Sequence, residues 1–443
     1  MKQCSEPDGP EPRADRQCGT SLPLSLSDRS SPYAAPADSE EIHAPASLLK
    51  PLLYGICWLT DFAAFVVVFA VSRGLAEANS ESWYLGLVGA GLSFSSGIGS
   101  LSGGWLAHRF DGRVVFLAGA GLMQVSILAC SLSDLTRPWF LPFYWLLGIA
   151  LGLLYPPLIG WLNQGEDIQG NRRGVSRTLI LFCVAWNLGM MGGQLAAGTL
   201  FSAGAAWTYG AALLSGALNI VVAVFAVRQV RPTVVTGVTG GRPDASMAAL
   251  ASAFKRLSWI ANLGGMFGGS MVIHLLPDLA VTIGVPADAH GQMLACWRAV
   301  IIATYLVMHN VAFWHYRHST AVASQVLAAT GLLVIASAES GLTLLIGLSL
   351  LGQLVGYNYF SGLFYSTVGS DNERRALAAG IHEATLAAGM AIGTLVGGWL
   401  GTVVDQRLPY TVAAFVLLIL IAVQAAAWYR WVRPLRGNAD RQS

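Results

Sequence analysis

Charged side chains are scarce in this sequence of 443 residues. Asp, Glu, Lys and Arg together supply 11% of the chain, whereas soluble domains carry about 25%, and 54% of the residues are hydrophobic. The net charge is only +2, and no basic patch stands out. This composition excludes most soluble functions and gives no reason to expect a nucleic-acid partner.

Motifs for disulfides, metals and nucleotides are also missing. The six cysteines are scattered, at no spacing typical of a disulfide framework or a zinc site. No Gly-x-x-x-x-Gly-Lys-Ser/Thr loop is present, which excludes ATP-driven transport by this chain alone. We therefore expect no cofactor and no metal. Only the histidines 309, 315 and 318 leave a metal or haem site open, as a minor alternative.

Apolar runs, by contrast, fill the chain from Leu52 to about Trp431. A membrane-spanning helix needs about 20 mostly apolar residues. Twelve runs meet that requirement, and they predict an all-α polytopic membrane protein in contact with the lipid bilayer. The predicted spans are 52–72, 83–107, 114–133, 139–162, 177–202, 207–228, 257–283, 290–314, 320–339, 341–368, 377–403 and 409–431.

The distribution of Lys and Arg predicts the orientation, because basic residues favour cytoplasmic loops. One set of connections carries nearly all of them, and the opposite set has only Arg73, Arg137 and Arg407. The rich set comprises Arg109, Arg113, Arg172, Arg173, Arg177, Arg228, Arg231, Arg242, Lys255, Arg256, Arg317, Arg374 and Arg375. We expect both termini to be cytoplasmic, in the plasma (inner) membrane.

This orientation makes a direct prediction about topology. Reporters fused after Arg433 or within 231–250 should read cytoplasmic, and a tag inserted between Arg73 and Ser82 should read external. Reporter fusions in intact cells measure each position. An external reading for the C-terminus would contradict both the orientation and the even number of spans.

Composition divides the chain into five parts. Residues 1–47, rich in Ser, Pro, Asp and Glu, have no apolar period and are expected to form a disordered tail. A six-helix bundle (48–228), a cytoplasmic linker (229–256), a second six-helix bundle (257–431) and a short tail (432–443) follow.

The two bundles resemble each other in sequence. Gly148, Gly152 and Tyr155 of the fourth span recur in the tenth as Gly352, Gly356 and Tyr359, at a constant offset. Gly189, Met190, Gly193, Leu195 and Gly198 of the fifth recur in the eleventh as Gly389, Met390, Gly393, Leu395 and Gly398. Parallel six-helix repeats with a solute site at their interface are a transporter architecture. Gly393 is expected to lie at a tight moving contact, so that Gly393→Leu would arrest transport and leave expression largely intact.

The loop after the second span reads GWLAHRFDGR at 104–113. It resembles the signature loop of the major facilitator superfamily, glycine-x-leucine-alanine-aspartate-arginine-x-glycine-x-arginine. The matching positions are Gly104, Leu106, Ala107, Arg109 and Arg113. The resemblance covers about 50–431 and implies two six-helix halves, with spans one, two, four, five, seven, eight, ten and eleven around a central cavity.

Two positions of this loop depart from the family pattern. His108 stands where the family has aspartate, and Asp111 stands where it has glycine. The family aspartate latches the cytoplasmic side of the two halves together. In this chain the latch is therefore absent, carried by Asp111, or dependent on protonation of His108.

Asp61 lies near the middle of the first span. A central carboxylate costs about 2.5–3.5 kcal/mol in the membrane, so it should face protein or a wet cavity. Tyr54, Trp58 and Phe65 share its helix face by spacing. An aromatic face with one acid is typical of a solute pocket, although a structural acid bonded to a neighbouring helix remains an alternative.

Other polar residues inside the spans are further candidates for the solute and coupling site. Arg298 in the eighth span should pair with Asp61 or bind an anionic group of the solute, and Glu383 in the eleventh is a second titratable acid. Asn187, Tyr357 and Asn358 add polar groups on the fifth and tenth spans, where tying helices together is the simpler role. Asn262 is expected to be a structural residue at a helix end, and Pro277 to kink the seventh span.

These features favour a secondary transporter of a small organic solute, expected to be monomeric, with proton coupling through Asp61 and Glu383 as an option. Two alternatives stay open. One is a non-transporting sensor or scaffold with the same fold, since the loop is altered and the fourth span has Pro156-Pro157 in place of an exchanger's arginine. The other is a membrane-embedded enzyme, for which the sequence offers only the histidine group.

Overall fold

The computed structural model describes residues 48–162, 172–230, 245–370 and 375–435. The predicted tail 1–47 and half of the predicted linker (231–244) lie outside this part. Every regular element in it is an α-helix. The helices are α1 (Leu49–Glu77), α2 (Ser82–Arg109), α3 (Gly112–Ser131), α4 (Phe140–Leu162), α5 (Arg172–Phe201), α6 (Ala205–Gln229), α7 (Ala245–His274), α8 (Leu276–Thr282), α9 (Ala287–Asn310), α10 (His318–Ala336), α11 (Gly341–Val368), α12 (Arg375–Val403) and α13 (Leu408–Trp431).

Eleven of the described helices are long and apolar enough to cross a membrane, and α7 with α8 makes a twelfth span if the bent pair counts as one. The two axes differ by 45°. Pro277, in the first turn of α8, has no N–H to donate, and its ring would clash with the carbonyl of Ile273 in a continuous helix. The predicted kink at Pro277 is confirmed.

The start of α7 differs from the prediction. The helix begins at Ala245, well before the predicted span at 257, because the segment is rich in Ala and favours helix without being apolar throughout. Lys255 there donates to the carbonyl of Gly369 at 2.7 Å. Asn262 is therefore not a helix-end residue. It is fully buried, and its Nδ2 lies 2.9 Å from His382 Nδ1.

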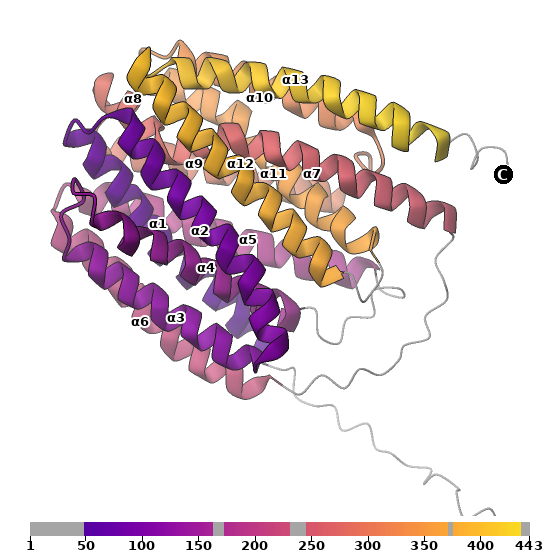
Figure 1. Cartoon of the computed structure of the whole chain (residues 1–443), viewed down its shortest axis with the longest axis horizontal. Coiled ribbons are helices and arrows are strands. Elements are labelled where there is room, and N and C mark those ends of the chain that lie inside the picture. Colours follow the sequence, from indigo (N-terminus) through magenta and orange to yellow (C-terminus); the bar gives the residue numbers. More distant parts are fainter. Residues whose placement is uncertain (1–47, 163–171, 231–244, 371–374, 436–443) are drawn as a thin grey trace, which may run out of the picture. The chain divides into compact units, whose positions relative to one another are not determined.

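The same helix pairings occur twice. In the first half, α1 packs on α5 and α6, α2 packs on α4, and α3 packs on α4 and α6. In the second half, α7 packs on α12 and α13, α9 packs on α11, and α10 packs on α11 and α13. The α3–α6 pair and the α10–α13 pair lie on opposite sides of the helical unit (Figure 1). Contacts between the halves are made chiefly by α2 with α12 and by α5 with α9.

The recurring glycines explain much of this packing within each half. A Cβ atom at Gly189 or Gly193 would collide with the carbonyl oxygen of Trp58 or Phe62 on α1. At the equivalent positions of α12, a Cβ would collide with the carbonyl oxygen of Leu263 or Phe267 on α7; these positions are Gly389 and Gly393. Only glycine allows the backbones to approach so closely.

Gly393 therefore packs inside the second half, against α7. The predicted tight contact is present, and its partner is α7 of the same half, which sequence repetition could not name. A leucine there would displace the backbone of α7, so loss of folded protein is expected in place of a folded but arrested carrier.

Two other glycine pairs do join the halves. A Cβ at Gly86 on α2 would stand 2.8 Å from the Cα atom of Gly398 on α12, and one at Gly198 on α5 would stand 2.9 Å from the Cα atom of Gly291 on α9. The two pairs occupy repeat-equivalent positions. We call the end of the helices that carries these four glycines the closed end.

Hydrogen bonds add to the contact at the closed end. The guanidinium of Arg73 donates to the carbonyl of Val285 at 3.0 Å, and the hydroxyl of Ser82 donates to the carboxylate of Asp278 at 2.6 Å. The backbone N–H of Trp83 donates to the hydroxyl of Thr402 at 2.7 Å. Both halves are thus held together at this end by backbone contact and by directional bonds.

Candidate functional site

A cavity of about 190 Å³ lies between the halves. Its lining comes from α1, α2, α4, α5, α7, α9, α11 and α12, which are spans one, two, four, five, seven, eight, ten and eleven. The prediction from the family resemblance is thereby confirmed. Along the helices, the lining runs from His274 near the closed end to Ser100 and Ile159 towards the other end.

Asp61 lines this cavity from α1 and is 2% exposed. The hydroxyl of Tyr155 on α4 donates to its Oδ2 atom. Gly189 lets α5 lie directly behind the acid, because a Cβ there would stand 3.1 Å from the Cβ of Asp61. The carboxylate is therefore fixed on two sides and directed into the cavity.

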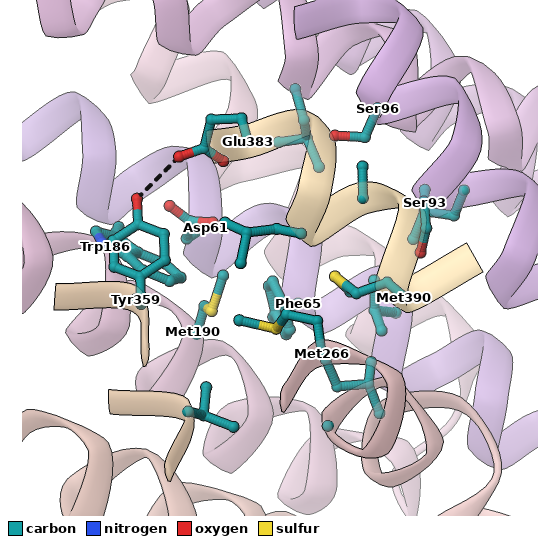
Figure 2. A pocket seen from close by; sticks show the side chains of 18 of the residues that line it. Asp61, Phe65, Ser93, Ser96, Trp186, Met190, Met266, Tyr359, Glu383 and Met390 are labelled. Carbon is teal, nitrogen blue, oxygen red and sulfur yellow. Dashed lines mark hydrogen bonds between the residues drawn. The ribbon is translucent and has the colours of Figure 1, made fainter. Parts of the chain in front are cut away.

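Glu383 lines the same cavity from α12 (Figure 2). The hydroxyl of Tyr359 on α11 donates to its Oε1 atom at 3.3 Å. The ring of Tyr359 also packs on Trp186 of α5, with ring centroids 4.9 Å apart. Because Tyr155 and Tyr359 are repeat-equivalent, each half presents one acid bonded by the same tyrosine of its repeat.

Arg298, on α9, is the third charged residue of the lining. Its guanidinium lies over the ring of Trp297 at 4.4 Å and over the ring of Phe65 at 5.0 Å. The structure shows no ion pair between Arg298 and Asp61, although both line one cavity. The expected pairing is not formed here, because Tyr155 bonds the carboxylate while aromatic rings hold the guanidinium.

The other predicted site residues do not line the cavity. Trp58 is 38% exposed and stacks on Phe62, and Tyr54, one turn earlier, is half-buried. Asn187 is buried, and its amide donates to Tyr305 of α9 at 3.3 Å. Tyr357 bonds Thr320 at 3.0 Å, and the amide of Asn358 donates to the carbonyl of Ala261 at 2.8 Å. Asn187, Tyr357 and Asn358 thus connect helices around the cavity.

Sequence reasoning missed several cavity residues. Tyr155 and Tyr359 were visible as repeat markers, yet nothing in their spacing showed that each would bond an acid on another helix. Trp186 gave no signal, because an aromatic residue in an apolar run is usually core or lipid-facing. Three methionines from three helices also meet here: Met190, Met266 and Met390.

The described contacts of the signature loop lie within the first half. Asp111 caps α3 by accepting the N–H of Arg113 at 2.9 Å, and the guanidinium of Arg113 donates to the carbonyl of Val230 at 2.5 Å. The guanidinium of Arg109 lies over the ring of Trp105 at 5.3 Å, and Gly104 precedes it on α2. The side chain of His108 lies outside the described part.

For metal binding, the described residues contain no group of three His, Cys, Asp or Glu side chains able to hold an ion. His315 stacks on Phe364, and His318 stacks on Trp428.

Comparison with known proteins places the fold. No family model matches the chain, and no curated protein sequence matches it significantly. Several solved structures, however, are similar to this chain. The nucleoside transporter NupG covers 86% of this chain with all of its own length, at a TM-score of 0.62 and 12% identity. The human organic anion transporter MFSD10 covers 86% of this chain with 99% of its own length, at a TM-score of 0.63 and 15% identity.

A bacterial homologue of the human lysosomal transporter Spinster, in an inward-facing and occupied conformation, covers 88% of this chain with 98% of its own length. Its TM-score is 0.65 at 13% identity. At such identities the likeness concerns the fold alone. Helix order, repeated packing, the eight-helix cavity and these neighbours agree: the chain has the major facilitator superfamily fold.

Proposed function

We propose that this protein is a secondary transporter that carries a small organic solute across the membrane by alternating access. The observation that carries the proposal is the cavity, which is lined by both halves and lies beside a closed end that has no side chain between its glycines. Rocking one half against the other would open that end and close the opposite one around the same site.

Coupling to protons is part of the proposal. Asp61 and Glu383 are the acids of the cavity lining, and each has a tyrosine hydroxyl as hydrogen-bond donor. An acid that meets the cavity can take up a proton on one side of the membrane and release it on the other. We further propose the plasma membrane as the site of action, with the Arg-rich loops and both termini in the cytoplasm.

The solved neighbours are named as transporters of a nucleoside and of organic anions, and one is a homologue of a lysosomal transporter. These names support transport as the general activity of this fold. They differ in solute, so the solute class must be inferred from the residues of this cavity.

The test is uptake by proteoliposomes that contain only this protein. Pools of carboxylates, amines, sugars and nucleosides are supplied outside, and the lumen contents are analysed by mass spectrometry with and without a pH gradient. At least one solute should accumulate above the level of protein-free liposomes, and more so with the gradient. A folded protein that accumulates none of the pools would contradict transport and favour the sensor or scaffold alternative.

A further inference from the structure

The guanidinium of Arg298 is held in an uncommon way. The residue is 3% exposed, and the rings of Trp297 and Phe65, with centroids 4.4 Å and 5.0 Å from the guanidinium carbon, contact it from α9 and from α1. Stacking on aromatic rings stabilises the cation but uses none of its N–H groups. Hydrogen bonding is therefore left to the edge of the guanidinium.

Two nitrogens on that edge have no partner. Nε and Nη2 of Arg298 are buried and make no hydrogen bond. Their N–H bonds lie on the same side of the planar group, in the parallel fork that matches the two oxygens of a carboxylate. A buried donor without an acceptor is energetically unfavourable, so two adjacent unpartnered donors of this shape point to an acceptor that binds here.

The acids of the cavity do not supply that acceptor. Asp61 is bonded by Tyr155, Glu383 is bonded by Tyr359, and neither forms an ion pair with Arg298. A further lining residue adds an unused donor, because the indole Nε1 of Trp297 is buried without a partner. The hydrogen-bonding capacity left open in the cavity thus includes at least three N–H groups, which favours a solute that brings acceptors.

The rest of the lining defines the body of that solute. Met190, Met266 and Met390 meet in the cavity near Phe65 (Figure 2). Methionine side chains are flexible and polarizable, and they adapt to aromatic or irregular apolar groups. The site therefore offers one polar edge and one adaptable apolar surface.

We propose that the cavity binds an amphipathic monocarboxylate, whose carboxylate accepts both N–H groups of the Arg298 fork and whose apolar body packs on the three methionines. This inference rests on the proposed function only in taking the cavity to be the solute site. It commits to a carboxylate over an amine, although two acids line the same space, because each acid is bonded by a tyrosine while the paired N–H groups of Arg298 have no acceptor.

Binding to the purified full-length protein in detergent tests the proposal through three probes of one shape: phenylbutyrate, its amide and the corresponding amine. A ligand that binds the folded state raises the apparent melting temperature, and quenching of tryptophan fluorescence provides a second readout. We expect phenylbutyrate to bind at least about tenfold more tightly than the amide, which corresponds to about 1.4 kcal/mol. Tighter binding of the amine, equal binding of all three probes, or binding of none would overturn the proposal.

Arg298→Lys then tests the fork, because lysine keeps the charge and loses the paired donors. The variant should bind phenylbutyrate about tenfold or more weakly than the wild type and should bind the amide with unchanged affinity. Each melting temperature is compared with that of the same variant without ligand. Arg137→Lys is the matched control, since Arg137 is exposed and bonded only near its own loop. Unchanged phenylbutyrate affinity in Arg298→Lys would overturn the role of the fork. If that variant does not fold, the wild-type comparison of the three probes still decides.

The binding assay and the transport assay test the two proposals independently. Selective carboxylate binding without uptake by proteoliposomes would contradict the proposed transport and support the proposed binding site. Uptake of amines or sugars with no carboxylate binding would support the proposed transport and contradict the proposed carboxylate site at Arg298.

Discussion

Asp61→Asn is expected to abolish uptake driven by a pH gradient and to leave solute exchange intact. Asparagine has nearly the same shape as aspartate, and its side-chain oxygen can still accept a hydrogen bond from the hydroxyl of Tyr155. The cavity should therefore keep its form. It cannot bind or release a proton, so it resembles a permanently protonated carrier. Gradient-driven accumulation and counterflow exchange, measured on the same proteoliposomes, separate the two effects.

Asp134→Asn is the control for this experiment, because Asp134 lies in the exposed loop before α4 and accepts bonds from Thr136. Its gradient-driven uptake should equal that of the wild type. Full gradient-driven uptake by Asp61→Asn would remove Asp61 from the coupling mechanism. Glu383→Gln, which addresses the acid that the second half contributes to the cavity, would then be the next variant to test.

Gly86→Leu is expected to stop transport while the protein still folds. Its Cβ would stand 2.5 Å from the carbonyl oxygen of Thr394 and 2.8 Å from the Cα atom of Gly398, both on the opposite half. The halves can separate here without disturbing the packing within either one, so the variant should fold with the closed end forced apart. Exchange should fall to the level of protein-free liposomes, while yield and gel-filtration profile remain normal.

Two further glycines make this experiment specific. Gly121→Leu is the neutral control, because no atom lies within 4 Å of a Cβ at that position on α3. Gly393→Leu should instead reduce the yield of folded protein, since its collision is with α7 of the same half. Normal exchange by Gly86→Leu would show that the closed end does not have to close during the cycle.

The sequence was sufficient for the fold and for the charged residues of the cavity. Apolar runs located the spans, and Pro277 located a bend, because both depend on local chemistry. Asp61, Arg298 and Glu383 could be found because an ionisable side chain in an apolar helix must meet protein or water. All three line one cavity.

The partners of these residues could not be predicted, because they depend on how the helices are rotated about their axes. Tyr357 and Tyr359 are two residues apart, about 200° around a helix, and only Tyr359 lines the cavity. Spacing put Tyr54 and Trp58 on the same face as Asp61, but a face is wide enough for its members to meet different neighbours. Asn262 was misplaced for a related reason: the start of α7 is set by helix propensity and hidden from a hydropathy pattern.

The presence of one tyrosine-bonded acid in each half, Asp61 and Glu383, has an electrical consequence. If only one of the two acids carried a proton with each monocarboxylate, the cycle would move no net charge, and the membrane voltage would not affect it. If each half loaded its own acid, every cycle would carry one net positive charge. A membrane potential would then contribute about 2.3 kcal/mol per 100 mV to accumulation. The duplicated arrangement thus allows a carrier of an anionic solute to be driven by voltage as well as by acidity.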